Sequence, residues 1–257
     1  MASKNPINKK IYFTLLIASV ISIIAVLPYA FTLQADVIKL SPLPLPVLAL
    51  ISILQSSILF ALAIYIGLKL SDDVGLETPI LKNYFTNRKL PTDIKSNLIK
   101  SFSLGLLASA LIIFFDLVFK NLGVDISLSV NQIPPLWQRL MATLYGGINE
   151  EILLRLFFMT LIIWLIGKIT SYKTDLIKNN FMMWLAIILA AVIFGLGHLP
   201  ITSNITDLTP LVISRAILLN GLGGIIFGWL FWKKGLEYAM ISHFTADIMI
   251  IVIFPLI

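Results

Sequence analysis

Long apolar runs recur along the whole chain of 257 residues, and they constrain its fold more than any other feature of the sequence. Each run is near or above about 18 residues, the length at which an apolar helix can cross the hydrocarbon core of a bilayer. Hydrophobic residues make up 58% of the chain and charged residues only 12%, a composition outside that of soluble domains. The sequence predicts an all-α polytopic membrane protein, a bundle of about seven transmembrane helices with eight as the alternative. The predicted spans cover residues 11–33, 47–69, 98–119, 137–166, 181–199, 210–231 and 236–256.

The Lys and Arg residues of the loops predict the orientation, because short cytoplasmic loops carry an excess of both. If the spans alternate across the membrane, one side carries nearly all of these residues, namely Lys4, Lys9, Lys10, Lys69, Lys82, Arg88, Lys89, Lys95, Lys100, Lys168, Lys173, Lys178, Lys233 and Lys234. The loops of the other side carry only Lys39 and Lys120. We therefore expect a multi-pass integral membrane protein with a cytoplasmic N-terminus and a C-terminus on the opposite face. Contact with anionic lipid headgroups accounts for the net charge of +6, so no nucleic-acid partner is implied.

The sequence shows no boundary between independent domains, and we interpret residues 1–257 as a single integral membrane domain. Residues 1–97 contribute two spans and a polar cytoplasmic loop, and residues 98–257 contribute the core helices. The glycines between 221 and 228 predict that the sixth span packs closely against a neighbouring helix. The absence of cysteine excludes disulfides and thiolate metal sites. The sequence leaves the oligomeric state open.

The stretch "NEEILLRLFF" places three charged side chains inside the fourth predicted span. Each charge near the bilayer centre costs about 2.5–3.5 kcal/mol on insertion scales, so such residues usually face the interior of a bundle and mark function. Glu151 and Arg155 are four residues apart on one helix face, which predicts an ion pair. Glu150 points about 100° away and has no local cation. A carboxylate without a cation in a low-dielectric site has the character of a general base, and Gly146 and Gly147 just before it would permit a close approach.

The only two histidines of the chain, His198 and His243, both fall in predicted spans. His243 and Asp247 are four residues apart on one face, so they could orient one another, bind an oxyanion or offer two metal ligands. Together with Glu150, these residues predict a site where the fourth, fifth and seventh spans converge. Asp116 in the third span is interpreted differently, as a partner in a structural ion pair.

Helix lengths place these residues at unequal depths. Counted at about 1.5 Å per residue, Glu150 and His198 lie about 25 Å from the cytoplasmic helix ends, whereas His243 lies only about 10 Å from its own. Convergence then requires either shifted helix boundaries, or a tilt of the fourth and fifth helices together with a hairpin over 231–236 that dips into the membrane.

Three short motifs now carry a resemblance to a known family. They are Glu150-Glu151-x-x-x-Arg155, Phe194-x-x-x-His198 and His243-x-x-x-Asp247, in this order on three hydrophobic segments. They resemble the signature motifs of the CAAX protease and bacteriocin-processing (CPBP, Abi-like) intramembrane endopeptidases, which include the type II CAAX prenyl endopeptidase. The resemblance covers residues 140 to 250, approximately. It implies a helical membrane bundle that encloses an intramembrane catalytic cavity opening towards the lipid.

The resemblance also implies roles for individual residues. A water activated by Glu150 and His198 would hydrolyse a peptide bond, with His243 and Asp247 around the developing oxyanion. Glu151 and Arg155 would support the site. Many members have Asn at the position of Asp247, and Asp can donate a hydrogen bond only when protonated, so Asp247 could instead set the tautomer of His243.

Several alternatives stay open from the sequence. We favour a mechanism without a cofactor, and the alternative is a divalent metal such as zinc held by Glu150, His198, His243 and Asp247. The expected partners are the lipid bilayer and a membrane-bound peptide or prenylated protein substrate, with a leader peptide, a bacteriocin precursor or a signalling peptide as further candidates. Two other function classes fit the buried polar residues, a membrane protein that binds a peptide without cleaving it, as an immunity protein would, and a transporter.

Overall fold

Seven membrane-length helices form the bundle. The computed structural model describes residues 8–124, 126, 133–170 and 176–256, which contain helices and no strand. The spans are α1 (Lys9–Leu33), α3 (Leu45–Val74), α5 (Ile94–Asn121), Leu136–Ile169, Asn180–Thr202, α10 (Pro210–Lys234) and Leu236–Ile253. The predicted all-α membrane fold is thus confirmed, with seven spans among the described residues.

Three of these spans are built from more than one element. The fourth contains α6 (Leu136–Leu144), the π-helical segments η2 (Tyr145–Glu150) and η3 (Ile152–Met159), and α7 (Thr160–Ile169). The fifth contains α8 (Asn180–Gly197) and the single turn α9 (Leu199–Thr202), and the seventh contains α11 (Leu236–Asp247) and the π-helical η5 (Ile248–Ile253). The π-helical turns were not predicted from the sequence. Such turns occur mostly inside α-helices and frequently at functional sites.

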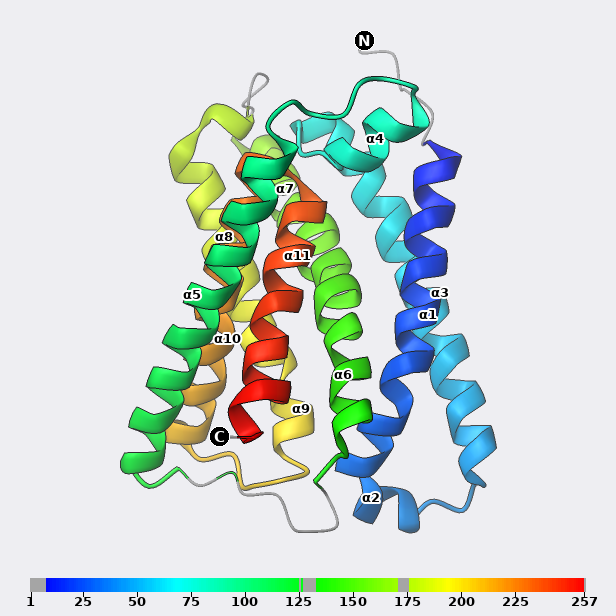
Figure 1. Cartoon of the computed structure of the whole chain (residues 1–257), viewed down its shortest axis with the longest axis vertical. Helices are drawn as coiled ribbons and strands as arrows, with labels where there is room; N and C mark the ends of the chain where they lie inside the picture. Colours follow the sequence, from blue (N-terminus) through cyan, green and yellow to red (C-terminus); the bar gives the residue numbers. More distant parts are fainter. Residues whose placement is uncertain (1–7, 125, 127–132, 171–175, 257) are drawn as a thin grey trace.

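The helices run roughly along the long axis of the molecule, with α1 and α3 on one side and α5, α8 and α10 on the other (Figure 1). The fourth span and α11 lie between these two groups (Figure 1). The short helix α4 (Pro79–Phe85) covers the end where the chain begins, and α2 (Ala35–Lys39) lies at the opposite end (Figure 1). We call these two ends the α4 end and the α2 end.

Local sequence signals explain where several helices begin and end. The side chain of Asn8 accepts hydrogen bonds from the backbone N–H groups of Lys10 and Ile11 and so caps α1. Thr209 caps α10 in the same way, with Pro210 at the first helical position, where its missing N–H costs nothing. Gly75 ends α3 with φ of 84°, a backbone conformation that favours glycine.

The hydrophobic core fills the half of the bundle nearest the α4 end. Many of its fully buried side chains come from the fourth, fifth and sixth spans, among them Ile152, Leu156, Met159, Ile163, Met183, Ile187, Leu230 and Phe231. Gly224 packs against Ala191 so closely that an added Cβ would lie 2.7 Å from the Cβ of that alanine. This confirms the predicted close approach of the sixth span to a neighbouring helix.

The hairpin between α10 and α11 lies beneath α4. The backbone N–H of Leu236 donates to the carbonyl of Glu77, and a Cβ on Gly235 would lie 2.2 Å from Cδ of Pro79. Because residues 77–79 cover the hairpin, α11 starts inside the protein and not at its surface. The structure thus contains the inward hairpin that the helix lengths raised as a possibility.

Candidate active site

Glu151 is completely buried and holds two partners on the core side of the fourth span. Its Oε1 lies 2.7 Å from Nδ1 of His243 and 3.1 Å from NH1 of Arg155. The first contact is a hydrogen bond from the imidazole to the carboxylate, and the second is the ion pair predicted from the spacing of four. The side chains of Glu151 and Arg155 are 0% and 2% exposed, so this pair is shielded from water.

The guanidinium of Arg155 has further partners that hold it in the apolar interior. It lies between the rings of Phe194 and Phe227, with Cζ 5.2 Å and 5.4 Å from their centroids. Its NH2 donates to the carbonyl of Gly224 at 3.4 Å. Contacts of a cation with aromatic faces and with a backbone dipole offset part of the cost of burying the charge.

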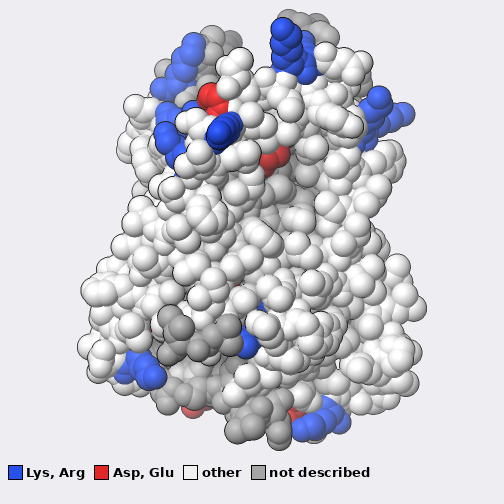
Figure 2. Space-filling model, in the orientation of Figure 1, with Lys and Arg blue, Asp and Glu red and all other residues white. Residues whose placement is uncertain are grey.

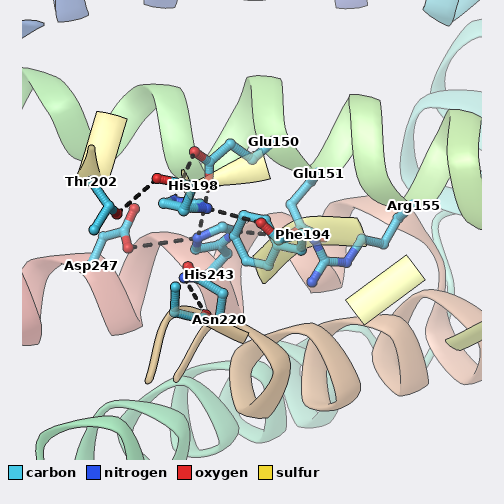
Figure 3. A network of polar contacts seen from close by, with 10 residues as sticks. Glu150, Glu151, Arg155, Phe194, His198, Thr202, Asn220, His243 and Asp247 are labelled. Carbon is cyan, nitrogen blue, oxygen red and sulfur yellow. Dashed lines mark hydrogen bonds and ion pairs between the residues drawn. The ribbon is translucent and has the colours of Figure 1, made fainter. Parts of the chain in front are cut away.

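Glu150 approaches the same His243 from a different direction than Glu151 and also faces His198 (Figure 3). Its Oε2 is 3.5 Å from Nε2 of His243, and its Oε1 is 4.0 Å from Nε2 of His198. The side chain of Glu150 is 21% exposed, in contrast to its fully buried neighbour. The predicted convergence of the fourth, fifth and seventh spans is therefore present in the structure.

His198 is fixed by the end of α8, where it is the first residue after the helix. Nδ1 of His198 lies 3.0 Å from the carbonyl oxygen of Phe194. The hydroxyl of Thr202 donates to the backbone carbonyl of His198 at 2.8 Å. A carbonyl only accepts hydrogen bonds, so Nδ1 carries a proton and the neutral ring presents the lone pair of Nε2 to Glu150.

His243 is held on three sides. Glu151 binds its Nδ1, the ring of Phe227 stacks on the imidazole with centroids 4.6 Å apart, and Nε2 faces both Glu150 and Asp247. The Nε2 of His243 lies 3.6 Å from Oδ1 of Asp247. The sequence left open that Asp247 sets the tautomer of His243, but Nδ1–H of His243 donates its hydrogen bond to Glu151.

Asp247 reaches the site because the opposing residue has no side chain. A Cβ at Gly146 would lie 1.9 Å from Oδ2 of Asp247 and 3.3 Å from Nε2 of His243. The close approach predicted for Gly146 is thus made by the two motif residues of the seventh span.

Two cavities meet at these residues. One has a volume of about 320 Å³ and is lined by Glu150, His198, His243 and Asp247 together with residues of α1, α5, α6 and α10. The other has a volume of about 710 Å³ and lies among α1, α2, α3 and the end of the fifth span. Glu150 and His198 line both cavities. The two side chains are therefore accessible from either space.

The positions of Glu150, His198, His243 and Asp247 bear on the alternative that these four side chains bind a divalent metal. Within the described parts of the chain, no group of three or more His, Asp or Glu side chains is spaced to hold a metal ion. The four residues proposed as ligands lie side by side, but as placed they do not form such a group. We derive no catalytic step through a metal.

Sequence analysis missed one polar cluster next to the site. Asn149 is fully buried and donates from Nδ2 to Oγ of Ser19 at 2.8 Å, and the hydroxyl of Ser22 donates to Oδ1 of Asn149. This cluster ties α1 to the π-helical turn that presents Glu150. The signal was present, since two serines three residues apart lie in the otherwise apolar first span.

The ion pair expected for Asp116 lies at the far end of the smaller cavity. Its Oδ1 accepts from Nε of Arg215 at 2.7 Å and lies 2.5 Å from NH2. The pair joins α5 to α10, as expected of a structural contact.

Comparison with known families agrees with the motifs. Residues 132–249 match the family model of the type II CAAX prenyl endopeptidases described as Rce1-like. Over these residues the chain is similar to that family. The family predicted from the three motifs is confirmed, and the match contains all seven motif residues. No curated protein and no solved structure is significantly similar to the chain.

Proposed function

We propose that the protein is an intramembrane endopeptidase in which Glu150 and His198 activate a water molecule for hydrolysis of a peptide bond. The observation that carries this proposal is the position of Glu150, a carboxylate on the wall of two cavities and between two imidazoles. The Rce1-like family match supports peptidase activity.

The geometry supports the following first step. Oε1 of Glu150 and Nε2 of His198 are 4.0 Å apart, too far for a direct hydrogen bond and close enough for one water to contact both. The lone pair of His198 accepts one hydrogen bond from this water, and Glu150 takes the proton as the water oxygen attacks the carbonyl carbon. General-base catalysis of this kind contributes about 100-fold to 10,000-fold in rate.

The second step breaks the C–N bond. The attack leaves negative charge on the former carbonyl oxygen, and Nε2 of a protonated His243, facing the smaller cavity, donates to it. Glu150 then returns its proton to the leaving nitrogen, and the products are a carboxylic acid and an amine. Asp247 contributes to the oxyanion site only when its carboxyl group is protonated, because an ionised carboxylate accepts and does not donate.

Glu151 and Arg155 act as positioning residues in this scheme. The carboxylate of Glu151 holds Nδ1–H of His243 and thereby directs Nε2 towards Glu150. Arg155 balances the charge of Glu151 in the core.

The larger cavity suits the apolar part of a membrane-associated substrate. Its wall is mostly aliphatic and aromatic, with Ile23, Val26, Leu27, Ala30, Phe31, Leu33, Val37, Ile38, Leu48 and Ile201. A lipid chain or an apolar peptide segment would bury its surface there while the adjoining peptide bond reaches Glu150. A prenylated CAAX C-terminus is the substrate class of the family, and a leader or signalling peptide with an apolar segment fits the same space.

Peptide cleavage by purified protein tests the proposal. The protein in lipid nanodiscs should cleave a membrane-bound peptide, with products identified by mass spectrometry, and the Glu150→Gln variant should not. A farnesylated CAAX peptide and the same peptide without the lipid would separate the two substrate classes. Binding of the peptide without cleavage would favour the non-proteolytic alternative, and flux of protons or ions through sealed vesicles without cleavage would favour a transporter.

The proposed mechanism needs no metal. Activity should persist after exhaustive chelation, and elemental analysis of active protein should show no stoichiometric zinc. Loss of activity on chelation that added zinc restores would assign metal binding to Glu150, His198, His243 and Asp247.

A further inference from the structure

Both cavities lie in the half of the bundle nearest the α2 end. Several helices line them with residues close to their own terminus at that end. Tyr29 is one turn from the end of α1, Ser52 lies in the second turn of α3, and Arg215 lies in the second turn of α10. His198 directly follows the last residue of α8. The catalytic residues are therefore reached from the α2 end.

Among the described residues, the other half of the bundle is closely packed next to the site. Between Glu150 and the α4 end, the interior is filled by side chains such as Ile152, Leu156, Met159 and Ile163, each 0% exposed. The separate cavity of about 190 Å³ near the α4 end is lined by residues such as Asn8, Glu77 and Thr86 and by none of the motif residues. Water and substrate from that side would meet close-packed apolar residues.

The basic residues gather at the closed end. Figure 2 shows Lys and Arg concentrated around the α4 end, with fewer at the opposite end. Those that the structure describes there are Lys9, Lys10, Lys69, Lys82, Arg88, Lys89, Lys95, Lys100, Lys168, Lys178, Lys233 and Lys234, while Lys4 and Lys173 lie outside the described residues. The excess of Lys and Arg marks the cytoplasmic side of membrane proteins. The accessible half of the bundle is then the extracytoplasmic half.

We propose that the site takes its substrate from the extracytoplasmic leaflet, and that the substrate is an exported peptide held in that leaflet by an apolar segment. The apolar segment occupies the larger cavity, and the peptide bond enters the smaller one. This inference rests on the proposed peptidase function. A lipid-modified protein in the cytoplasmic leaflet would have to approach through the packed half.

Single cysteines can test the direction of access, because the chain contains no native cysteine. Ser52→Cys places a thiol on the wall of the larger cavity, Ser203→Cys places one on the α2 end, and Thr86→Cys places one on the α4 end. Leu54→Cys is the matched control for Ser52, since Leu54 lies on the same helix and is 54% exposed on the outer surface of the bundle, where lipid surrounds it.

A membrane-impermeant maleimide applied to intact spheroplasts should label the cysteines at 52 and 203. The cysteine at 86 should be labelled only after permeabilisation, and the one at 54 should stay unlabelled because thiolate forms poorly in lipid. The reverse pattern for 52, 203 and 86 would overturn the proposal. Labelling at 203 without any at 52 would also contradict it, since the cavity would then be closed to water.

Paired reporter substrates test the class of peptide. One reporter presents a peptide outside the cell at the end of an apolar anchor, and the other presents the same peptide inside. The external reporter should lose its peptide in cells with active protein and keep it with Glu150→Gln. Cleavage of the internal reporter alone would overturn the inference and leave the peptidase function standing, whereas absence of any cleavage, including by purified protein, would instead refute the function. The labelling experiment does not depend on catalysis.

Discussion

The two faces of the fourth span contain the same residue type in opposite settings. Glu151 faces the packed half of the bundle, is fully buried and is bound by Arg155 and His243. Glu150 faces the cavities, and the basic side chains next to its carboxylate, among the described residues, are His243 at 3.5 Å and His198 at 4.0 Å. The difference shows that a buried carboxylate paired with an arginine supports the structure, whereas one beside a cavity and without an arginine partner is free for chemistry.

The largest expected effect is on the rate of cleavage and follows substitution of Glu150, on the cavity side. Glu150→Gln preserves size and removes the base, so turnover should fall by about 100-fold to 10,000-fold. The melting temperature in detergent should stay near that of the native protein, because no buried cation loses its partner. Cleavage rate and thermal unfolding of the same preparation measure both quantities. Undiminished turnover would remove Glu150 from the mechanism.

On the packed side, substitution of Glu151 should lower the stability of the fold. Glu151→Gln leaves the charge of Arg155 buried without its counter-ion, and breaking such a pair costs about 3–5 kcal/mol. The variant should also lose activity, because His243 loses the carboxylate that holds Nδ1. Thermal unfolding in detergent is the measurement, and Glu150→Gln is the matched control. An unchanged melting temperature would mean that the pair does not stabilise the fold.

Two adjacent glycines sharpen the comparison. A methyl group at Gly146 meets the carboxylate end of Asp247, which can rotate away, so Gly146→Ala should fold and lose activity by about 100-fold through displacement of the site. A methyl group at Gly147 would lie 2.9 Å from Cβ of Phe244 and 3.3 Å from the carbonyl of Met240, which cannot move alone. Gly147→Ala should therefore cost about 1–3 kcal/mol of stability. Equal losses of stability in the two variants would contradict this distinction.

The smallest effect is expected for Asp247→Asn. The amide donates to an oxyanion at any pH, so the variant should keep activity within about 10-fold of the native protein, whereas Asp247→Ala, without a donor, should lose about 100-fold. If Asp247 acts only when protonated, the Asn variant should also lose the decline in rate at high pH that ionisation of this group causes. Rates measured across pH for both variants check the two statements. Equal loss in the Asn and Ala variants would show that Asp247 acts otherwise.

Hydropathy was sufficient to predict the fold. The seven predicted spans agree with the observed helices to within a few residues at most ends, because apolar length alone decides which segments can cross a bilayer. The ion pair of Glu151 with Arg155 followed from local helix geometry. These features depend on residues that are close together in the sequence.

Features that depend on distant residues were not predicted. The hydrogen bond from His243 to Glu151 joins spans four and seven, and a rule based on spacings of four could only suggest Asp247 as the partner of His243. The position of the hairpin at Gly235 is set by residues 77–79, far away in sequence. The π-helical turns were not predicted, because hydrophobic periodicity does not distinguish a π-helical turn from the α-helix around it.

The most direct test of the account adds Arg155→Met to each glutamine variant and compares melting temperature with cleavage rate. In the Glu151→Gln background, the second change removes the unpaired charge and should recover part of the lost stability. In the Glu150→Gln background it should recover neither stability nor cleavage, because Glu150 is not the partner of Arg155. Equal destabilisation by Glu150→Gln and Glu151→Gln, with cleavage remaining in the Glu150→Gln variant, would contradict the assignment of one glutamate to catalysis and the other to structure.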